Sequence, residues 1–281
     1  MGIGLSALSA LPSHADPPAR TAVSKLPLTI VIPTLNEAAQ IAGLIHSLSW
    51  ADEVIVADGG STDGTVAAAR AAGAIVFERA GDTIAAQRNR AIAASRNRWV
   101  FALDADERIP QALQDELWHV LRAPGHLAYR VRRRNFFLGR ERRRGRWGRD
   151  WQVRLFTAER RFELDRVHER LEAVPDAGSL RAALLHTPYR NLRHQLDKLA
   201  VYALWGAQDL ELRGRRATLW SVTVRPLWRF TRDYVVYGSC LDGVFGLLTS
   251  TLTAYACFLK YAYLWELGRR ASPRDASAPV P

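Results

Sequence analysis

Strand-like and helix-like segments alternate four times between residues 26 and 122 of this 281-residue chain, and no other feature constrains the fold as strongly. Short runs of apolar, often β-branched residues predict buried strands, and the segments between them carry apolar residues at helical spacing. The predicted strands cover residues 26–35, 53–57, 74–77 and 99–103. Such alternation is typical of an α/β protein with a doubly wound, mostly parallel sheet.

Four regions are expected from the composition along the chain. Residues 1–26 are small and proline-rich without the basic start of a signal peptide, and we predict a disordered leader there. Residues 27–189 hold the α/β domain, whose sheet is closed by a late strand at 152–156. Residues 190–270 are predicted to be a helical region, and the small, polar residues 271–281 a disordered tail.

The helical region contains a stretch of 17 uncharged residues between Asp242 and Lys260. A transmembrane helix needs about 20 apolar residues, so this stretch is at the short edge of that range. Aromatic and basic residues flank it on both sides, which is typical of segments at a membrane interface. We therefore expect a membrane-associated extension, an interfacial or re-entrant helical hairpin over 218–267, with an ordinary buried helix as the alternative.

The chain is strongly basic, with 39 Lys and Arg against 28 Asp and Glu and a net charge of +11. This charge predicts an anionic partner, such as nucleic acid, a lipid headgroup or a phosphorylated substrate. Arginine supplies nearly all of it, and a guanidinium binds phosphate oxygens in pairs, although a GC-rich genome is the simpler explanation of the total. The charge is densest at 130–151, among two tryptophans. Only two cysteines occur, which excludes a disulfide framework and indicates a reducing, cytosolic setting.

Polar side chains follow the first, second and fourth predicted strands. Asn36, which we also expect to cap the next helix, and Glu37 follow the first strand; Asp58 ends the second; Asp104 and Asp106 follow the fourth. Open α/β sheets bind their ligands at the carboxyl ends of the strands. The sequence therefore predicts a ligand site at this edge of the sheet.

The pair Asp104 and Asp106 favours a metal ion in that site. Side chains at i and i+2 of an extended chain point the same way, and two carboxylates so close repel each other unless a cation lies between them. A hard divalent cation takes oxygen ligands, and Mg²⁺ commonly binds substrate phosphates as well. The alternative is a solvated turn in which Glu107 is one more surface acid.

Four motifs in order resemble the family 2 glycosyltransferases, which have the GT-A fold. The motifs are TIVIPTLNEAAQI, VIVADGGSTDGT, QRNRAI and FALDADERI. Later segments resemble the branch of lipopolysaccharide core glycosyltransferases that add glucose to the inner core, among them RRRNFFLGR, GRWGRDWQVRLF, VHERLE and LLHTPYRNLRHQLDKL. The resemblance implies a Rossmann-like, doubly wound mixed sheet followed by the helical extension.

The resemblance also implies roles for single residues. Those implied to bind the nucleotide are Pro33, Asn36, Glu37, Asp58, Arg88 and Asp104. Asp58 would contact the base, Arg88 would help to position the nucleotide, and Asp104 would lie near the ribose. Asp106 would hold a divalent cation, Mg²⁺ or Mn²⁺, on the diphosphate.

The catalytic base is the point at which the chain departs from the family. Many relatives carry a Glu-Asp pair there, and no such pair follows Glu107 in this sequence. Glu169 is the candidate base, with His168 beside it as a candidate metal ligand, and Asp150 is the rival base. The alternatives are a loop histidine at 168 and a surface acid at 169.

Together these features predict an inverting, metal-dependent glycosyltransferase. It would move a sugar from a nucleotide-sugar donor, expected to be a UDP-sugar, to a lipopolysaccharide-core or related lipid-linked glycan. We expect it at the cytoplasmic face of the inner membrane, on an anionic membrane surface.

A polyprenyl-phosphate sugar transferase, like the dolichol-phosphate mannose synthases, is the main alternative, because its acceptor is already an anion and needs no strong base. A nucleic-acid-binding protein would leave the strand-end carboxylates unexplained, so no nucleic acid partner is expected.

Overall fold

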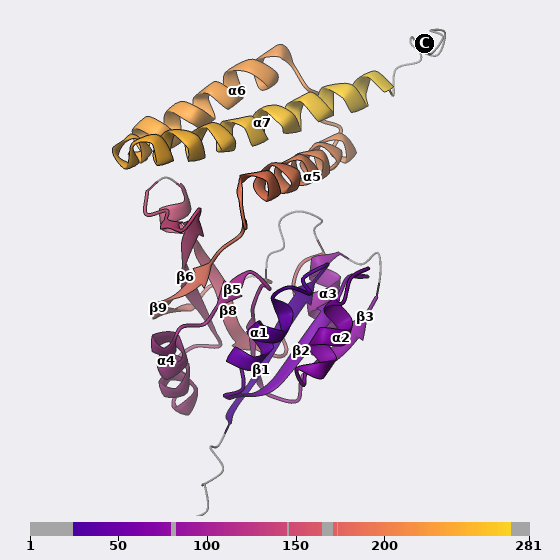
Figure 1. Cartoon of the computed structure of the whole chain (residues 1–281), viewed down its shortest axis with the longest axis vertical. Helices are drawn as coiled ribbons and strands as arrows, with labels where there is room; N and C mark the ends of the chain where they lie inside the picture. Colours follow the sequence, from indigo (N-terminus) through magenta and orange to yellow (C-terminus); the bar gives the residue numbers. More distant parts are fainter. Residues whose placement is uncertain (1–24, 80–82, 145, 165–170, 173, 271–281) are drawn as a thin grey trace, which may run out of the picture.

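The computed structural model describes residues 25–79, 83–144, 146–164, 171–172 and 174–270. The tail at 271–281 and nearly all of the leader lie outside these residues, and so do His168 and Glu169. The expected domain boundaries therefore stay predictions. Figure 1 shows an α/β part with a layer of long helices on one side of it.

Nine strands form one mixed sheet in the described residues, in the order β3-β2-β1-β4-β8-β6-β9-β5, with β7 paired to β6. Their bounds are β1 Leu26–Thr34, β2 Ala51–Asp58, β3 Ile75–Glu78, β4 Trp99–Ala102, β5 Glu107–Arg108, β6 Ala128–Phe137, β7 Arg140–Glu141, β8 Trp151–Thr157 and β9 Gly178–His186. The first four strands pair in parallel, and β8 joins β4 in the antiparallel sense. The predicted doubly wound mixed sheet is confirmed.

The first four helices cover both faces of this sheet. They are α1 Ile41–Ser47, α2 Thr65–Ala71, α3 Ile84–Ala93 and α4 Gln111–Arg122. Successive residues of a strand point to opposite faces, so Ile30 and Ile32 join the core under α1 and α4, whereas Val31 joins the core under α3. Both faces are buried, which explains why β1 reads as a continuous apolar run.

The start of the first helix differs from the prediction. Asn36 does not cap it, because α1 begins only at Ile41. Asn36 instead takes a left-handed backbone conformation with φ of 57°, which asparagine tolerates better than most residues. Its Oδ1 accepts a hydrogen bond of 2.9 Å from the Thr62 backbone N–H. Asn36 therefore ties the end of β1 to the turn after β2.

Three long helices form the C-terminal layer: α5 Leu192–Leu212, α6 Leu219–Thr231 and α7 Val244–Arg270. The uncharged stretch lies inside α7, which packs along both α5 and α6 (Figure 1). Ala207, Tyr261 and Leu264 form a small core within the layer. Among the residues that the structure describes, no helix combines the length and apolarity needed to cross a bilayer.

The helical layer rests on the hairpin of β6 and β7. Arg144 pairs with Asp242, and the buried Arg142 lies 4.0 Å from Asp233 with its guanidinium over the Trp147 ring. Asp233 lies in a short π-helix at Arg232–Val236, and Asp242 ends a 3₁₀ helix at Ser239–Asp242. These two segments join α6 to α7. The same hairpin thus supports the helices at its tip and, nearer the sheet, carries residues of the candidate site.

Candidate active site

Three neighbouring strands bring the predicted polar residues to one edge of the sheet. β2, β1 and β4 are adjacent, and the last residues of β1 and β2, Thr34 and Asp58, are register partners. Beyond the end of β4, the Leu103 N–H still bonds to β1 at Val31. Asp104 therefore leaves the sheet beside Asn36 and Asp58, as the strand-end pattern predicts.

Asp58 is buried and organises the turn after β2. Its Oδ2 accepts hydrogen bonds from the backbone N–H groups of Gly60 (2.9 Å) and Ser61 (2.7 Å), and its Oδ1 accepts from the hydroxyl groups of Thr34 and Ser61. Gly60 has φ of 98°, a conformation that favours glycine. Asp58 thereby holds the loop that faces the end of β1 in one conformation.

Pro33, Glu37 and Asn36 form the facing rim. Pro33 is half-buried within β1 opposite Ala57. The Glu37 carboxylate accepts a hydrogen bond of 2.7 Å from the Gln40 side chain. The same carboxylate acts on Arg108, whose pKa is lowered by burial in spite of the acids Asp106 and Glu37 nearby.

Asp104 is the centre of a cluster of arginines. Arg88 from α3 and Arg154 from β8 each donate a hydrogen bond to its carboxylate, and Arg133 from β6 lies 3.9 Å away. Burial by itself would raise the pKa of Asp104, but these three arginines outweigh burial and hold the pKa well below its usual range. Asp104 is therefore ionised, and Arg88, also packed over the Phe162 ring at 4.9 Å, holds it in place.

Glu107 is fully buried, so the alternative of a surface acid is wrong for this residue. It accepts hydrogen bonds from the Asp104 backbone N–H (2.9 Å), Arg154 (2.5 Å) and Arg133 (3.2 Å). Burial, helped by the neighbouring Asp104 charge, raises the pKa of Glu107 although the arginines oppose it. Glu107 thus closes the turn after β4 and shares both arginines with Asp104.

Asp106 faces His186, the last residue of β9, the strand that pairs with β5. Its Oδ1 lies 3.5 Å from His186 Nε2, and its backbone carbonyl accepts a hydrogen bond of 3.0 Å from the Thr187 N–H. The other ring nitrogen of His186, Nδ1, is 2.6 Å from Asn135 Oδ1. The Asn135 amide group donates to the Trp147 carbonyl and to Asp150, so its oxygen faces the ring and favours the proton on Nδ1.

The tautomer of His186 decides which atoms meet between this ring and Asp106. Neutral His186 protonated at Nδ1 presents an unprotonated Nε2 to the Asp106 carboxylate, which is favourable only with a proton or a cation between them. A carboxylate with phosphate oxygens suits Mg²⁺ or Mn²⁺, and a neutral imidazole nitrogen is the commonest metal ligand among side chains. In the described part of the chain, no group of three or more acidic, histidine or cysteine side chains is placed so that it could hold a metal ion, so further ligands would have to be substrate oxygens or residues outside that part.

Asp150 lies close to this pair through Asn135. Its carboxylate accepts hydrogen bonds from Arg133 (2.9 Å), Asn135 (3.2 Å) and Gln152 (2.9 Å). Burial would raise the pKa of Asp150, but the Arg133 charge and these hydrogen bonds hold it below its usual value. The rival base is therefore an ionised, well-oriented carboxylate, whereas Glu169 and His168 lie outside the described residues.

Four residues of the site were not found by the sequence analysis: Arg133, Asn135, Arg154 and His186. Each lies in the second half of the sheet, on β6, β8 or β9. For Arg154 and His186 the signal in the sequence is a polar residue in or at the end of a largely apolar strand, where it needs a buried partner. Arg133 and Asn135 lie among other polar residues of β6, which gives no such signal.

Known proteins are similar in sequence to this chain over much of its length. The sequence model of the family described as glycosyl transferase family 2 matches residues 29–189. The lipopolysaccharide core biosynthesis glycosyltransferase LpsC of Rhizobium meliloti (strain 1021) is 29% identical over 266 residues, which cover 87% of this chain and 94% of that protein. The uncharacterized glycosyltransferase RT0209 of Rickettsia typhi (strain ATCC VR-144 / Wilmington) is 26% identical over 258 residues, which cover 87% of this chain and 88% of that protein.

Among solved structures, glucosyl-3-phosphoglycerate synthase from Mycobacterium tuberculosis, in complex with Mn²⁺, UDP and glucosyl-3-phosphoglycerate, is 30% identical in the matched part with a TM-score of 0.33. That match covers 39% of this chain and 44% of the other chain, which is less than half of either. The family match, by contrast, extends from β1 through the end of β9 and includes every described residue of the candidate site. The chain is a glycosyltransferase and belongs to family 2 of these enzymes.

Proposed function

We propose that this protein is an inverting, metal-dependent glycosyltransferase that moves a sugar from a UDP-sugar to a lipopolysaccharide-core or related lipid-linked glycan. The observation that carries the proposal is the strand-end edge formed by Asp58, Asp104 and Asp106, in a chain of the glycosyltransferase family. The likeness to LpsC over most of both chains supports the class of acceptor. We assign the nucleotide to this edge, because open α/β sheets bind ligands there.

The nucleotide side is assigned to the rim around β1 and β2. Pro33, Asn36 and Glu37 would line one side of the base and Asp58 would contact it, through the turn whose shape it holds. Asp104 would lie near the ribose. Arg88 is buried and donates a hydrogen bond to Asp104, so its role is to position that carboxylate.

A divalent cation, Mg²⁺ or Mn²⁺, would be held by Asp106 and His186, with His168 as a further candidate ligand. When bound, it supplies positive charge to the diphosphate as the bond to the sugar breaks. The residues fit such an ion because His186 Nε2 and Asp106 Oδ1 already face each other at 3.5 Å. Arg108, close to Asp106, would add positive charge on the same side.

The base removes the proton from the acceptor hydroxyl while that oxygen attacks the anomeric carbon from the side opposite the diphosphate. Glu169 is the first candidate and Asp150 the rival. In favour of Asp150, Asn135 bonds both it and His186, so the two would stand on one side of the donor. Its lowered pKa keeps it ionised and able to accept the proton, but makes it a weaker base.

A membrane surface is the proposed meeting place with the acceptor, on the cytoplasmic face of the inner membrane. Four large apolar side chains of α6 are strongly exposed: Leu219, Trp220, Leu227 and Trp228. Exposed large apolar side chains on a helix that also carries exposed basic residues such as Arg225 suit an interface with anionic lipid. The interfacial placement of the α6–α7 pair is therefore retained as part of the proposal.

The proposal is tested by thermal unfolding of the full chain with UDP, GDP and ADP, each with and without Mn²⁺. A ligand that binds only the folded state raises the melting temperature. We expect a rise with UDP that requires Mn²⁺, and transfer of sugar from a UDP-sugar to rough lipopolysaccharide. No rise with any nucleotide would contradict the donor class, and a rise with GDP alone would point to a different donor.

A further inference from the structure

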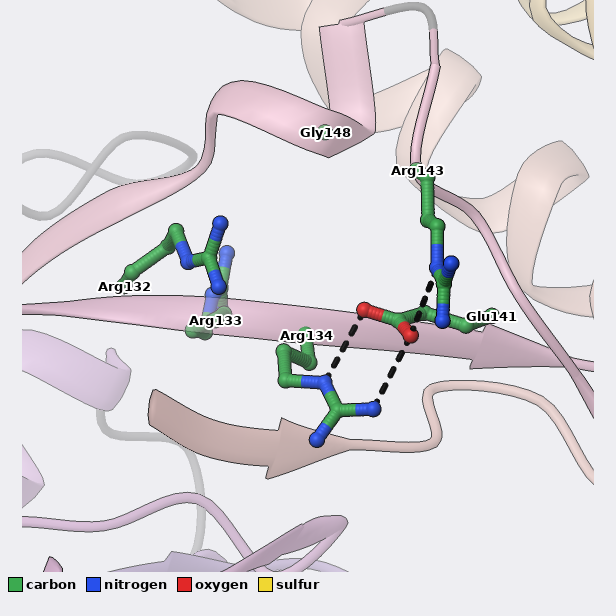
Figure 2. Close-up of a pocket in the computed structure, with 6 residues that line it drawn as sticks. All are labelled: Arg132, Arg133, Arg134, Glu141, Arg143 and Gly148. Carbon is green, nitrogen blue, oxygen red and sulfur yellow. Dashed lines mark hydrogen bonds and ion pairs between the residues drawn. The ribbon is translucent and has the colours of Figure 1, made fainter. Parts of the chain in front are cut away.

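A hollow lined by arginines lies on β6 beside the candidate active site. It has a volume of about 330 Å³, at the small end of the range of ligand pockets. Its lining residues, here called the arginine pocket, are Arg132, Arg133, Arg134, Glu141, Arg143 and Gly148 (Figure 2). Of these, only Arg133 also contacts the residues proposed for catalysis.

The charge of the arginine pocket is far from balanced, since four guanidinium groups line it with one carboxylate. Glu141 is the shared partner of Arg134, which donates two hydrogen bonds of 2.9 Å, and of Arg143, which donates one of 3.1 Å (Figure 2). The bonds from Arg134 and Arg143 lower the pKa of Glu141 to about 2, so it stays ionised at neutral pH. Glu141 therefore fixes two arginines in place and leaves most of their N–H groups for another acceptor.

Arg132 adds a positive charge without an ion-pair partner in the described chain. It is exposed on β6, and Figure 2 shows it next to Arg133, with both side chains rising toward the turn that carries Gly148. Holding like charges so close costs free energy, which a bound anion would offset. The lining residues thus carry a net positive charge that suits an anionic ligand.

The wall opposite β6 is set by the backbone. At Gly148 a Cβ atom would lie 2.0 Å from the Arg143 carbonyl oxygen, a distance that no side chain permits. The turn at Arg146–Arg149 can close against the segment after β7 only because this residue is glycine. One wall of the hollow is consequently backbone whose position is fixed by the fold, while the arginine and glutamate side chains form the rest.

Arg133 connects the arginine pocket to the active site. Its guanidinium lies 2.8 Å from Asp150 and 3.2 Å from Glu107, so a group bound in the pocket is separated from Asp150 by one side chain. That position is on the acceptor side, because the nucleotide is assigned to the rim of β1 and β2. An anion held there would be part of the molecule that receives the sugar.

We propose that the arginine pocket binds a phosphate group carried by the acceptor glycan. A phosphomonoester offers several oxygens with two negative charges, and arginine pairs with such oxygens by two parallel hydrogen bonds. This inference rests on the proposed function and adds to it the class of acceptor: a phosphorylated sugar close to the hydroxyl that is glycosylated. A phospholipid headgroup has the same chemistry, and the experiment separates the two sources.

The test compares Arg132→Gln and Arg143→Gln with Arg122→Gln, which removes an exposed arginine at the end of α4. Binding of inorganic phosphate to the full chain is measured by calorimetry at low salt, independently of any transfer reaction. We expect each pocket variant to weaken phosphate binding by about tenfold, and Arg122→Gln to leave it unchanged. Phosphate binding by both pocket variants as tight as that of Arg122→Gln would overturn the proposal.

A second arm measures transfer to core oligosaccharide freed of lipid A, either intact or dephosphorylated with aqueous hydrofluoric acid. For the unmodified protein we expect dephosphorylation to raise the acceptor KM about tenfold at constant kcat. For Arg132→Gln we expect the two acceptors to have the same KM, because this variant lacks the Arg132 guanidinium that would bind the phosphate. A preference for the intact acceptor that survives in both pocket variants would overturn the proposal.

A third arm addresses lipid, with vesicles of phosphatidylcholine alone or with phosphatidylglycerol. We expect Arg132→Gln to bind both as the unmodified protein does. Loss of vesicle binding with an unchanged acceptor KM would assign the pocket to a headgroup and overturn the acceptor assignment. Absence of UDP stabilisation in all variants would reject the proposed function, while phosphate binding that depends on Arg132 would still support an anion site.

Discussion

His186 Nε2 lies 3.5 Å from Asp106 Oδ1, while the Nδ1 atom of the same ring is held by Asn135 Oδ1 at 2.6 Å. Strand pairing causes this contact: β5 and β9 run antiparallel, with Glu107 and His186 as register partners. A histidine from a late strand thereby completes the carboxylate edge that begins with β1, β2 and β4. The contact brings a second candidate cation ligand to Asp106, different from the histidine at 168 that the sequence analysis names.

Substitution of His186 tests the metal assignment. We expect His186→Ala and Asp106→Ala each to weaken binding of Mn²⁺ in the presence of UDP on the order of 100-fold, or roughly 2.7 kcal/mol, because each removes a ligand. Removal of the metal with a chelator should abolish transfer by the unmodified protein. Electron paramagnetic resonance of free Mn²⁺ measures the affinity, and His46→Ala, an exposed histidine of α1, is the control. Unchanged affinity in His186→Ala would exclude this residue as a ligand.

The identity of the base is tested by amide substitutions. Glu169→Gln is expected to reduce kcat by about 10²–10⁴-fold with little change in donor affinity, because the amide cannot accept the proton. The control is Glu163→Gln, which changes an exposed acid nearby in the sequence. If Asp150→Asn causes the loss instead, Asp150 is the base. Full activity in both would reject both carboxylates.

Glu107 is expected to stabilise the fold through Arg154. Both side chains are buried, and Glu107→Gln removes one of the two charges that compensate this arginine. Breaking such a buried pair costs about 3 kcal/mol, which urea unfolding measures directly. Asp115→Asn, which alters an exposed acid of α4, should cost less than about 0.5 kcal/mol. A loss as small as that in Glu107→Gln would contradict the structural role.

Glu141 predicts a dependence of stability on pH. Its pKa falls from an ordinary value of 4.5 to about 2 in the folded state, through hydrogen bonds from Arg134 and Arg143. A depressed pKa stabilises the folded state above pH 4.5, and this contribution disappears as the pH falls toward 2. Glu141→Gln should therefore be less stable than the unmodified protein by about 1 kcal/mol at pH 7, with the difference shrinking at pH 3.5 and below. A difference that does not vary with pH would show that Glu141 acts by shape alone.

Membrane association is expected to depend on α6. Trp220 and Trp228 have exposed fractions of 64% and 58%, and we expect the double variant Trp220→Ser/Trp228→Ser to lose at least about tenfold in affinity for anionic vesicles. Transfer to an oligosaccharide without a lipid anchor should stay unchanged. The control is Leu127→Ser, which removes a 51% exposed side chain of the α/β part. Equal sedimentation of all variants with vesicles would contradict an interfacial role for α6.

The α/β sheet and the strand-end carboxylates follow from local patterns. The apolar runs of β1, β2 and β4 and the helical spacing between them depend only on neighbouring residues, so they can be seen without knowing the fold. The rule that ligands meet the carboxyl ends of strands then places Asp58, Asp104 and Asp106 together. Asn36 was assigned to the right edge but to the wrong contact, because a helix cap and a loop anchor use the same residue type.

By itself, the sequence determined the fold class, the family and the acids at the edge of the sheet, because each of these can be recognised from short segments of neighbouring residues. Only the tertiary structure decided which groups face those acids. His186, Arg154 and Arg133 reach Asp106, Asp104 and Glu107 because β8, β6 and β9 follow β4 in the sheet, an order that no local pattern specifies. Burial of Glu107 and the pKa of Asp104 were decided in the same way, because desolvation and charge depend on neighbours in space and not on neighbours along the chain.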